Sequence, residues 1–311
     1  MKIAGIDIGG TKISGAIIEN GEIISEVIKE QTPFDSQKIL EIVENIINQF
    51  IITTDIQAIA IATAGAVNNE NSKVIGSTGN LPKDYPDVEF KKILEEKFNK
   101  FTLMENDANA AAFAEHKTGA AKGSKSSITV TLGTGVGGGI ILDGKILKGK
   151  SGAAGEVGHL MLGIKNERAC TCGQYNCFEA YVSGTGFRKT IKELASELKE
   201  FKTSILKDKN IKDLTTYEVI SGYKENDEFC KRAYETWENQ LIIGLTSLAN
   251  IFDPDCIVIS GGLSNEVNYG KVEKAVNEKI VTTTLKVLPA TSGNYAGMIG
   301  AALLAEEKIQ N

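Results

Sequence analysis

A short stretch of this sequence occurs twice, 123 residues apart, and no other feature constrains the fold as strongly. Residues 10–24 match residues 133–147 at seven of fifteen positions, and the pair Asn20-Gly21 falls on Asp143-Gly144. Both pairs are typical of two-residue hairpin turns. A chance likeness between two hairpins rich in glycine and isoleucine is the alternative. The repeat favours a duplicated strand–turn–strand–turn–strand unit in each of two domains, with two sheets facing each other across a cleft.

The other elements expected along the chain alternate between strands and helices. The expected strands are residues 3–8, 13–18, 22–29, 57–63, 101–105, 256–260 and 285–288. The expected helices are residues 36–50, 107–117 and 227–251, one from about residue 265, and residues 298–307. This alternation is typical of α/β domains, and 311 residues suit two of them. Small and charged residues mix at 118–125, which marks a hinge between a first domain of residues 1–118 and a second of residues 119–294.

The charge balance and the hydropathy narrow the classes of partner. The chain has 34 Lys and Arg against 40 Asp and Glu, and the net charge of -6 disfavours a general electrostatic grip on nucleic acid. No apolar run approaches the roughly 18 residues of a membrane-spanning helix. The first residues also lack the apolar core of a signal peptide. A cytoplasmic protein with no nucleic-acid or membrane partner is therefore expected.

Glycine-rich turns follow the first strand of each repeat and suggest phosphate binding. Glycine lets the backbone approach a ligand closely and lets successive N–H groups point at an anion. The acid before the first turn suits Mg²⁺ beside a phosphate. The candidate residues are Asp7 for Mg²⁺, Gly9, Gly10, Thr11 and Lys12 in the first turn, and Gly133, Thr134 and Gly135 in the second. Each turn leads into a strand, so neither fits the Walker pattern or the dinucleotide-binding pattern.

A third glycine pair, Gly261 and Gly262, ends the strand expected at 256–260 and opens into a helix. Its position suits the nucleoside end of a polyphosphate ligand. Any one such turn is a weak indication, because most glycine turns bind nothing.

Asn106 and Asp107 lie at a junction between an expected strand and an expected helix. Either side chain suits the N-cap of that helix, which is a structural role. The functional alternative is that Asp107 accepts the proton of an attacking hydroxyl. Phosphoryl transfer needs one base on its nucleophile and otherwise depends on positioning and charge neutralisation.

One histidine and three cysteines have the spacing of a metal site. His159 is followed 11 to 18 residues later by Cys170, Cys172 and Cys177. One imidazole and three thiolates form a closed tetrahedral zinc site, which would order the polar loop 166–176. Reduced cysteines that only pack are the alternative, and a disulfide is disfavoured in the cytoplasm. The remaining histidine and cysteines lie in helix or strand patterns and are interpreted as structural: His116, Cys230 and Cys256.

The three glycine segments resemble the two phosphate segments and the adenosine segment of the actin, Hsp70 and hexokinase ATPase superfamily. Within it, the chain resembles the ROK family of repressors, open reading frames and sugar kinases over nearly its whole length. The motifs that carry this are Gly-Glu-Val-Gly-His at 155–159 and Cys-x-Cys-Gly-x-x-Asn-Cys-x-Glu at 170–179. Asn176 replaces the usual glycine of the second motif. Since Asn tolerates a left-handed backbone, the zinc site is still expected.

The resemblance implies an α/β fold of two ribonuclease-H-like domains flanking a central cleft, with a C-terminal helix at about 295–311 completing the first domain. It makes Asp107 the catalytic base and places ATP, with Mg²⁺, at the glycine turns. The residues it implies at the sugar are Gly65, Asn80, Asn106, Asp107, Glu156, His159 and Glu179. His159 would bind structural Zn²⁺ through one ring nitrogen and the sugar through the other. Family members are usually homodimers.

The implied activity is ATP-dependent phosphorylation of a hexose at its 6-hydroxyl, a step of carbohydrate metabolism and glycolysis. Glucose is the first choice, and N-acetylmannosamine and fructose are the alternatives. Residues 131–139 and 155–159 resemble glucokinases, whereas 62–65, with no proline after the glycine, is closer to N-acetylmannosamine kinases. Lys83-Asp84-Tyr85 replaces the usual Gly-Trp beyond Pro82, which leaves the choice of sugar open.

Two other classes of function are disfavoured. A sugar-responsive repressor of the same family would carry a helix-turn-helix before the first phosphate turn, and that turn begins here at Asp7. Chaperone and filament ATPases of the superfamily are longer and lack the sugar and zinc segments.

Overall fold

The computed structural model describes residues 1–76, 79–163 and 167–310, and these form two compact units. The first unit comprises Met1–Thr129, Gly139–Gly155 and Ala290–Asn311, and the second comprises Val130–Gly138 and Glu156–Pro289. The chain passes between the units at four points, and residues 118–125 lie inside the first unit. The domains of residues 1–118 and 119–294 remain a prediction, and their boundary differs from that of the compact units.

The first unit is built on a mixed sheet in the order β3-β2-β1-β5-β8. Its strands are β1 (Lys2–Ile8), β2 (Lys12–Glu19), β3 (Glu22–Ile23), β5 (Ala58–Thr63) and β8 (Phe101–Asn106), and β4 (Ile28–Gln31) pairs with β2. β1 is antiparallel to β2 and parallel to β5, which is parallel to β8. A separate two-stranded ribbon consists of β6 (Ala66–Val67) and β7 (Val74–Gly76).

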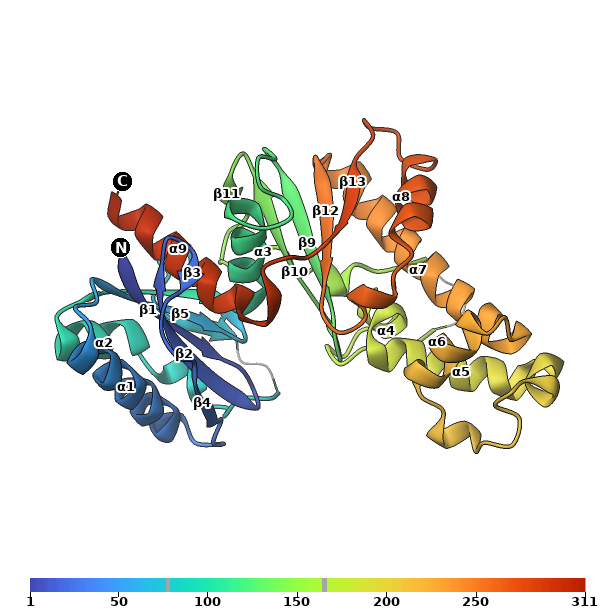
Figure 1. Ribbon diagram of the computed structural model, residues 1–311, viewed down its shortest axis with the longest axis horizontal. Helices are drawn as coiled ribbons and strands as arrows, with labels where there is room; N and C mark the ends of the chain where they lie inside the picture. Colours follow the sequence, from blue (N-terminus) through green and yellow to red (C-terminus); the bar gives the residue numbers. More distant parts are fainter. Residues whose placement is uncertain (77–78, 164–166, 311) are drawn as a thin grey trace. The chain divides into compact units, whose positions relative to one another are not determined.

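Helices cover both faces of this sheet (Figure 1). Alternate residues of a strand point to opposite faces. Ile6 and Ile8 therefore pack with α1 (Ser36–Thr53) and α2 (Phe90–Phe98), while Ile3 packs with α3 (Asp107–Lys117) and α9 (Ala296–Gln310). The expected helix at 36–50 and the expected final helix are confirmed, each a few residues longer than predicted.

The α3–α9 contact depends on small side chains. A Cβ added at Gly300 of α9 would lie 1.7 Å from the carbonyl oxygen of Ala110 in α3. Glycine is therefore required at this crossing, and the C-terminal helix is part of the first unit.

The strand expected at 22–29 was wrong in its middle, because the chain leaves the sheet between β3 and β4. The hydroxyl of Ser25 accepts a hydrogen bond from the N–H of Ile17 at 2.9 Å. In a continuous strand a backbone carbonyl would accept this hydrogen bond, whereas here a side-chain hydroxyl accepts it.

The second sheet repeats the order of the first, as β11-β10-β9-β12-β13. Its strands are β9 (Ser127–Leu132), β10 (Val136–Leu142), β11 (Lys145–Ile146), β12 (Cys256–Ser260) and β13 (Lys286–Pro289). β11 lies exactly the repeat distance after β3. The turns also correspond, since φ is 54° and 79° at Asn20 and Gly21 and 49° and 75° at Asp143 and Gly144. The predicted duplication is therefore confirmed in the fold.

A helical insertion distinguishes the second unit. Between β11 and β12 the chain forms α4 (Glu179–Val182), α5 (Gly184–Glu197), α6 (Thr216–Lys224) and α7 (Glu228–Phe252). Trp237 of α7 stacks on Phe187 of α5 and donates its ring N–H to the carbonyl of Val182 at 2.9 Å. The helix expected from about residue 265 begins later, as α8 (Tyr269–Asn277), because Asn268 caps it through the N–H of Lys271.

Candidate active site and metal centre

The first glycine turn joins β1 to β2 and lies beside one of the predicted sugar residues. The N–H of Gly9 donates to the carbonyl of Lys12 at 3.0 Å, which closes the turn, and Thr11 and Lys12 are exposed. A Cβ added at Gly10 would lie 2.5 Å from Cβ of Asn80. The structure therefore brings the first phosphate turn against Asn80, and only glycine fits there.

Asp7 lies two residues before this turn, on the sheet face that α3 and α9 cover. It shares that face with Ile3 and Gly5, because the three residues alternate along β1. Burial, and then the negative charge of Asp107, raises the pKa of Asp7 to about 7, while the Lys12 ammonium acts in the opposite sense. Two carboxylates thus share one half-buried place, and this arrangement fits a divalent cation that would neutralise them.

Asn106 and Asp107 form the junction between β8 and α3, as predicted. The side-chain oxygen of Asn106 accepts from the N–H of Asn109 at 3.0 Å, so Asn106 is the N-cap of α3. Its amide nitrogen donates to the carbonyl of Gly65 at 3.0 Å and to Oδ1 of Asp107 at 3.2 Å. Oδ1 of Asp107 also accepts from the N–H of Ala108 at 2.8 Å. The cap role and the site role therefore coexist, because the capping Asn106 also orients the carboxylate of Asp107.

In the second unit, two predicted nucleotide segments adjoin. The N–H of Gly133 donates to the carbonyl of Gly135, and a Cβ added at Gly261 would lie 2.5 Å from the carbonyl oxygen of Leu132. Gly261 has φ of 88°, which favours glycine. Gly262 has open space at its Cβ position. The second glycine turn and the third glycine pair thus form one surface, although the third pair opens into a short 3₁₀ turn at Ser264–Glu266 and not directly into an α-helix.

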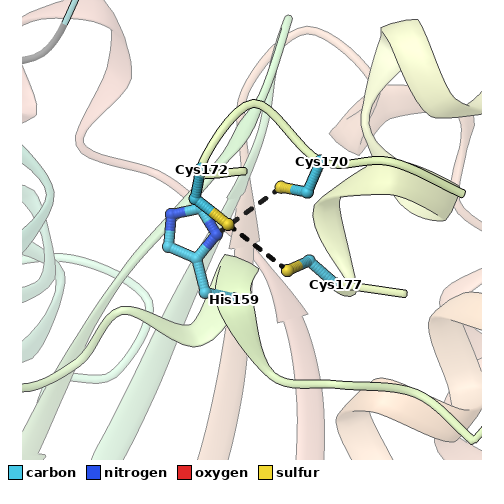
Figure 2. Close-up of side chains that lie close together, drawn as sticks. All are labelled: His159, Cys170, Cys172 and Cys177. Carbon is cyan, nitrogen blue, oxygen red and sulfur yellow. Dashed lines mark hydrogen bonds between the residues drawn. The ribbon is translucent and has the colours of Figure 1, made fainter. Parts of the chain in front are cut away.

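The predicted metal ligands converge in the second unit. One ligand atom from each of His159, Cys170, Cys172 and Cys177 lies within 4.8 Å of the others. Figure 2 shows the imidazole and the three thiols pointing toward a common centre. Nδ1 of His159 lies 3.7 Å from Sγ of Cys170, and the sulfurs of Cys172 and Cys177 are 3.6 Å apart.

These spacings fit a tetrahedral metal ion. Zinc–sulfur bonds of about 2.3 Å place tetrahedral sulfurs about 3.8 Å apart. The backbone N–H of Gln174 is the main cause of a lowered pKa at the Cys172 thiol, which favours the thiolate that a metal binds. Burial raises the pKa of the Cys177 thiol to about 12, so a cation would be needed to hold it as a thiolate. The donor set is that of a closed structural site.

Residues 170–177 carry the three cysteine ligands and are called the metal loop. Glu179 links this loop to the second glycine turn. One carboxylate oxygen accepts from the hydroxyl of Thr171 at 2.8 Å, and the other accepts from the N–H of Val136 at 2.9 Å. Nε2 of His159, the nitrogen that faces away from the thiols, lies 4.0 Å from a carboxylate oxygen of Glu156. The three predicted sugar residues of this unit therefore adjoin its metal ligands.

Asn176 adopts the left-handed backbone expected where the family motif has glycine, with φ of 62°. Its side-chain oxygen accepts from the N–H of Arg168 at 3.1 Å and from the hydroxyl of Tyr181 at 2.7 Å. Asparagine thus adds hydrogen bonds to the loop that glycine could not supply. Asn166, the first residue of the predicted loop, lies outside the described residues.

The residues interpreted as structural are buried. Nδ1 of His116 lies 3.4 Å from the hydroxyls of Ser124 and Ser127, and Cys230 and Cys256 are free thiols in the core. None of these residues belongs to the group of potential metal ligands found among the described residues.

The family model described as "ROK family" matches residues 3–308. The chain belongs to the ROK family. This ROK protein is 32% identical to a glucokinase of Streptomyces coelicolor over 312 residues, which covers 97% of each chain. It is 31% identical to an N-acetylmannosamine kinase of Vibrio cholerae, over 99% of this chain and 100% of that one.

A solved structure of similar fold is a ROK family glucokinase from Streptomyces griseus in complex with glucose and AMPPNP. It has a TM-score of 0.78 and 29% identity to this ROK protein, over 99% of this chain and 100% of that chain. The mixed α/β fold of the actin and hexokinase ATPase type is thereby confirmed. Among the described residues, no helix combines the length and the apolar character needed to cross a bilayer.

Two supporting residues of this ROK protein were missed in the sequence. Glu105 is fully buried, and its carboxylate accepts from the N–H of Asn106 at 2.9 Å and from the amide of Asn109 at 3.3 Å. Lys148 forms an ion pair with Glu105 at 3.0 Å. The only signal in the sequence was an acid inside a strand pattern, and nothing there identified its distant partner.

Proposed function

We propose that this ROK protein is a sugar kinase that transfers the γ-phosphoryl group of ATP to the 6-hydroxyl of a hexose, and that glucose is its substrate. The glucokinases among its relatives and the glucose and AMPPNP bound in the similar structure support this activity. The observation that carries the proposal is the arrangement of Asp107, whose carboxylate is oriented by Asn106 and by the N–H of Ala108.

The base is Asp107, which accepts the proton of the attacking hydroxyl. A carboxylate needs only correct placement for this role, because most of the catalysis in phosphoryl transfer comes from positioning and electrostatics. Around the sugar, the hydroxyls bind Gly65, Asn80, Asn106, Glu156, His159 and Glu179. The two glycine turns cradle the phosphates through backbone N–H groups, with Thr11, Lys12 and Thr134 as further donors, and Gly261 and Gly262 lie at the nucleoside.

Two metals belong to this proposal. Asp7 holds Mg²⁺ or its water ligands, and Mg²⁺ when bound neutralises charge on the phosphates. Zn²⁺ is held by His159, Cys170, Cys172 and Cys177, a set that fits a structural site. His159 would bind the zinc through Nδ1, which leaves Nε2 facing the sugar residue Glu156.

The first test is the variant Asp107→Asn, which keeps the shape of the side chain but cannot accept a proton. We expect kcat to fall by about 10² to 10⁴-fold, the usual contribution of a general base, while the Kd for glucose stays within a few-fold of the parent. Steady-state kinetics and calorimetry measure the two quantities. Asp55→Asn is the matched control, since that carboxylate is 90% exposed and lies on the surface. A variant that kept more than a few per cent of kcat would refute the role of Asp107.

N-acetylmannosamine is the second candidate substrate, because an N-acetylmannosamine kinase is among the relatives. A panel of glucose, N-acetylmannosamine, N-acetylglucosamine and fructose, scored by kcat/KM for ADP release, distinguishes these activities. The highest kcat/KM with glucose supports the proposal. If none of the four sugars stimulates ADP release, the kinase activity itself is refuted.

We further propose that the protein acts as a cytoplasmic homodimer in glycolysis. Members of the ROK family are usually homodimers, and sedimentation velocity of the purified protein tests the dimer.

A further inference from the structure

A cavity of about 520 Å³ in the first unit takes no part in the proposed reaction. Four lysines line it: Lys91, Lys145, Lys148 and Lys308. This volume lies within the range of small-molecule sites in proteins. We name it the lysine cavity.

The lysines of this cavity are incompletely neutralised. Lys148 pairs with the buried Glu105, whereas Lys308 donates to the neutral side-chain oxygen of Asn71 at 2.9 Å. Lys145 is exposed, and within the described residues no ion pair involves it. The nearest acid to Lys91 is Glu95, at 4.0 Å.

Three acids also line the cavity, and they cancel only part of this charge. Glu105 pairs with Lys148, and Glu70 adds a second carboxylate to the lining. Glu307 forms an ion pair at 2.5 Å with Lys117, which does not line the cavity. Four ammonium groups against three carboxylates leave the lining with a net positive charge, so an anion is the ligand of matching charge.

The ammonium groups lie close enough to repel one another. Burial is the first cause of a lowered pKa at Lys308, and the charges of Lys148 and Lys91 also lower it. An anion placed among these groups would remove that repulsion, because opposite charges within several ångströms favour the charged form of lysine.

Apart from Asn69 and Asn71, the rest of the lining is apolar and in part aromatic. The apolar part is formed by Phe101, Leu103, Phe113, Ile146 and Leu304. The Lys91 ammonium lies 5.3 Å from the ring centre of Phe101, so charge and ring adjoin. A bare inorganic anion would leave this apolar surface uncovered, whereas an anion with an apolar part would bury it at roughly 25 cal/mol per Å².

We propose that the lysine cavity binds a phosphate monoester that carries an apolar or aromatic group. A phosphate monoester has a charge of about −1.5 to −2 at pH 7 and three acceptor oxygens, which several ammonium groups can contact at once. Lysine is suited to it as a point-charge donor. A carboxylate offers these ammonium groups less charge and fewer acceptor oxygens.

The cavity is also connected to the catalytic segment. Glu105 lines it and, on its other side, accepts from the N–H of Asn106. An anion that draws Lys148 toward itself competes with Glu105 for that ammonium.

Phenyl phosphate is the probe that tests binding, because it has the charge and the ring but no sugar hydroxyl. Titration calorimetry with the full chain at pH 7.5 and low salt measures its Kd. We expect inorganic phosphate to bind at least tenfold more weakly, since it covers none of the apolar lining. Saturating glucose and AMPPNP should leave the Kd for phenyl phosphate within a few-fold.

Two variants test the location. Lys91→Gln combined with Lys308→Gln, and separately Lys145→Glu at an exposed position of β11, should each weaken phenyl phosphate binding at least tenfold. Lys38→Gln is the matched control, since Lys38 is an exposed lysine of α1 outside the cavity and should leave the Kd unchanged. Thermal melting of each variant shows whether it is folded.

Three results would overturn the proposal. The first is no measurable heat of binding with phenyl phosphate at concentrations up to about 10 mM, which would mean a Kd above that value. The second is competitive displacement of phenyl phosphate by AMPPNP. The third is unchanged affinity for phenyl phosphate in cavity variants that remain folded. Because none of these measurements involves turnover, they stand or fall separately from the kinase activity.

Discussion

At the scale of single residues, the carboxyl group of Asp7 makes the stability of the first unit depend on pH. The pKa of Asp7 rises from 3.8 to about 7 in the folded protein, mainly through burial and then through Asp107. Between these values the folded state binds a proton that the unfolded state releases. The free energy of unfolding therefore falls as pH rises through this window.

The variant Asp7→Asn removes this dependence. In metal-free buffer the free energy of unfolding of the variant minus that of the parent should be on the order of 2 kcal/mol higher at pH 8 than at pH 5. This value is discounted for the partial exposure of the carboxyl group. Urea unfolding at the two pH values measures the difference, with Asp55→Asn as the control. An equal effect of Asp7→Asn at both pH values would contradict the shifted pKa.

Glu105 and Lys148 form the other residue-scale feature. The Glu105 side chain is fully buried and that of Lys148 is 17% exposed. Removing one partner of such a pair leaves a buried charge uncompensated, so Lys148→Met should lower the free energy of unfolding by about 3 kcal/mol. The double variant Lys148→Met with Glu105→Gln should recover much of that loss, as a urea double-mutant cycle would show.

Lys97→Met is the control for this cycle. Lys97 pairs with Glu44 at the surface at 2.7 Å, and its loss should cost less than about 1 kcal/mol. If the double variant were as unstable as Lys148→Met, the buried charge would not be the cause.

At the scale of elements, the metal loop supports more than its own fold. Glu179 joins the hydroxyl of Thr171 in the loop to the N–H of Val136 after the second glycine turn. Loss of the metal should therefore raise KM for ATP as well as for the sugar. If only the KM for the sugar changed, loss of the metal would not affect the second glycine turn through Glu179.

The variant Cys177→Ala tests this link without a chelator. Cys177 is the buried ligand, so its loss should abolish metal binding. Metal analysis should give one zinc ion per parent chain and none per variant chain, and both KM values should rise severalfold. Cys256→Ala, at a core thiol outside the site, should keep its zinc.

Elements were predictable from the sequence where local rules decide them. The hairpin turns at Asn20-Gly21 and Asp143-Gly144 need a positive φ at both residues. Asn-Gly and Asp-Gly pairs are typical of such turns, so these turns could be predicted. The gap between β3 and β4 was not predictable, because the side chain of Ser25 replaces a backbone partner. The predicted metal ligands lie close together in sequence, and the folded chain brings them together, whereas Glu105 and Lys148 are 43 positions apart and only the folded chain pairs them.

At the scale of the whole molecule, the chain order makes the first unit depend on its last helix. α9 follows the entire second unit in sequence, yet it belongs to the first unit and packs on α3. The first unit is therefore complete only after the last helix has been synthesised. Its stability should depend on the fit of α9 while the second unit remains unaffected.

Gly300→Ala tests this independence. An added Cβ would lie 1.7 Å from the carbonyl oxygen of Ala110, so the helices must move apart, and we expect a loss of about 3 kcal/mol in the first unit. The matched control is Gly297→Ala in the same helix, where the nearest atom to the new Cβ is 3.4 Å away. That change should be neutral or slightly stabilising, because alanine favours a helix.

Trp237 distinguishes the two units in this experiment, because it is the single tryptophan of the chain and lies in the second unit. Chains of two units need not unfold in one step. In Gly300→Ala, far-ultraviolet circular dichroism should therefore show an early transition that Trp237 fluorescence does not follow. If both signals shifted together by the same amount, the two units would unfold as one, and the dependence on α9 would extend to the whole chain.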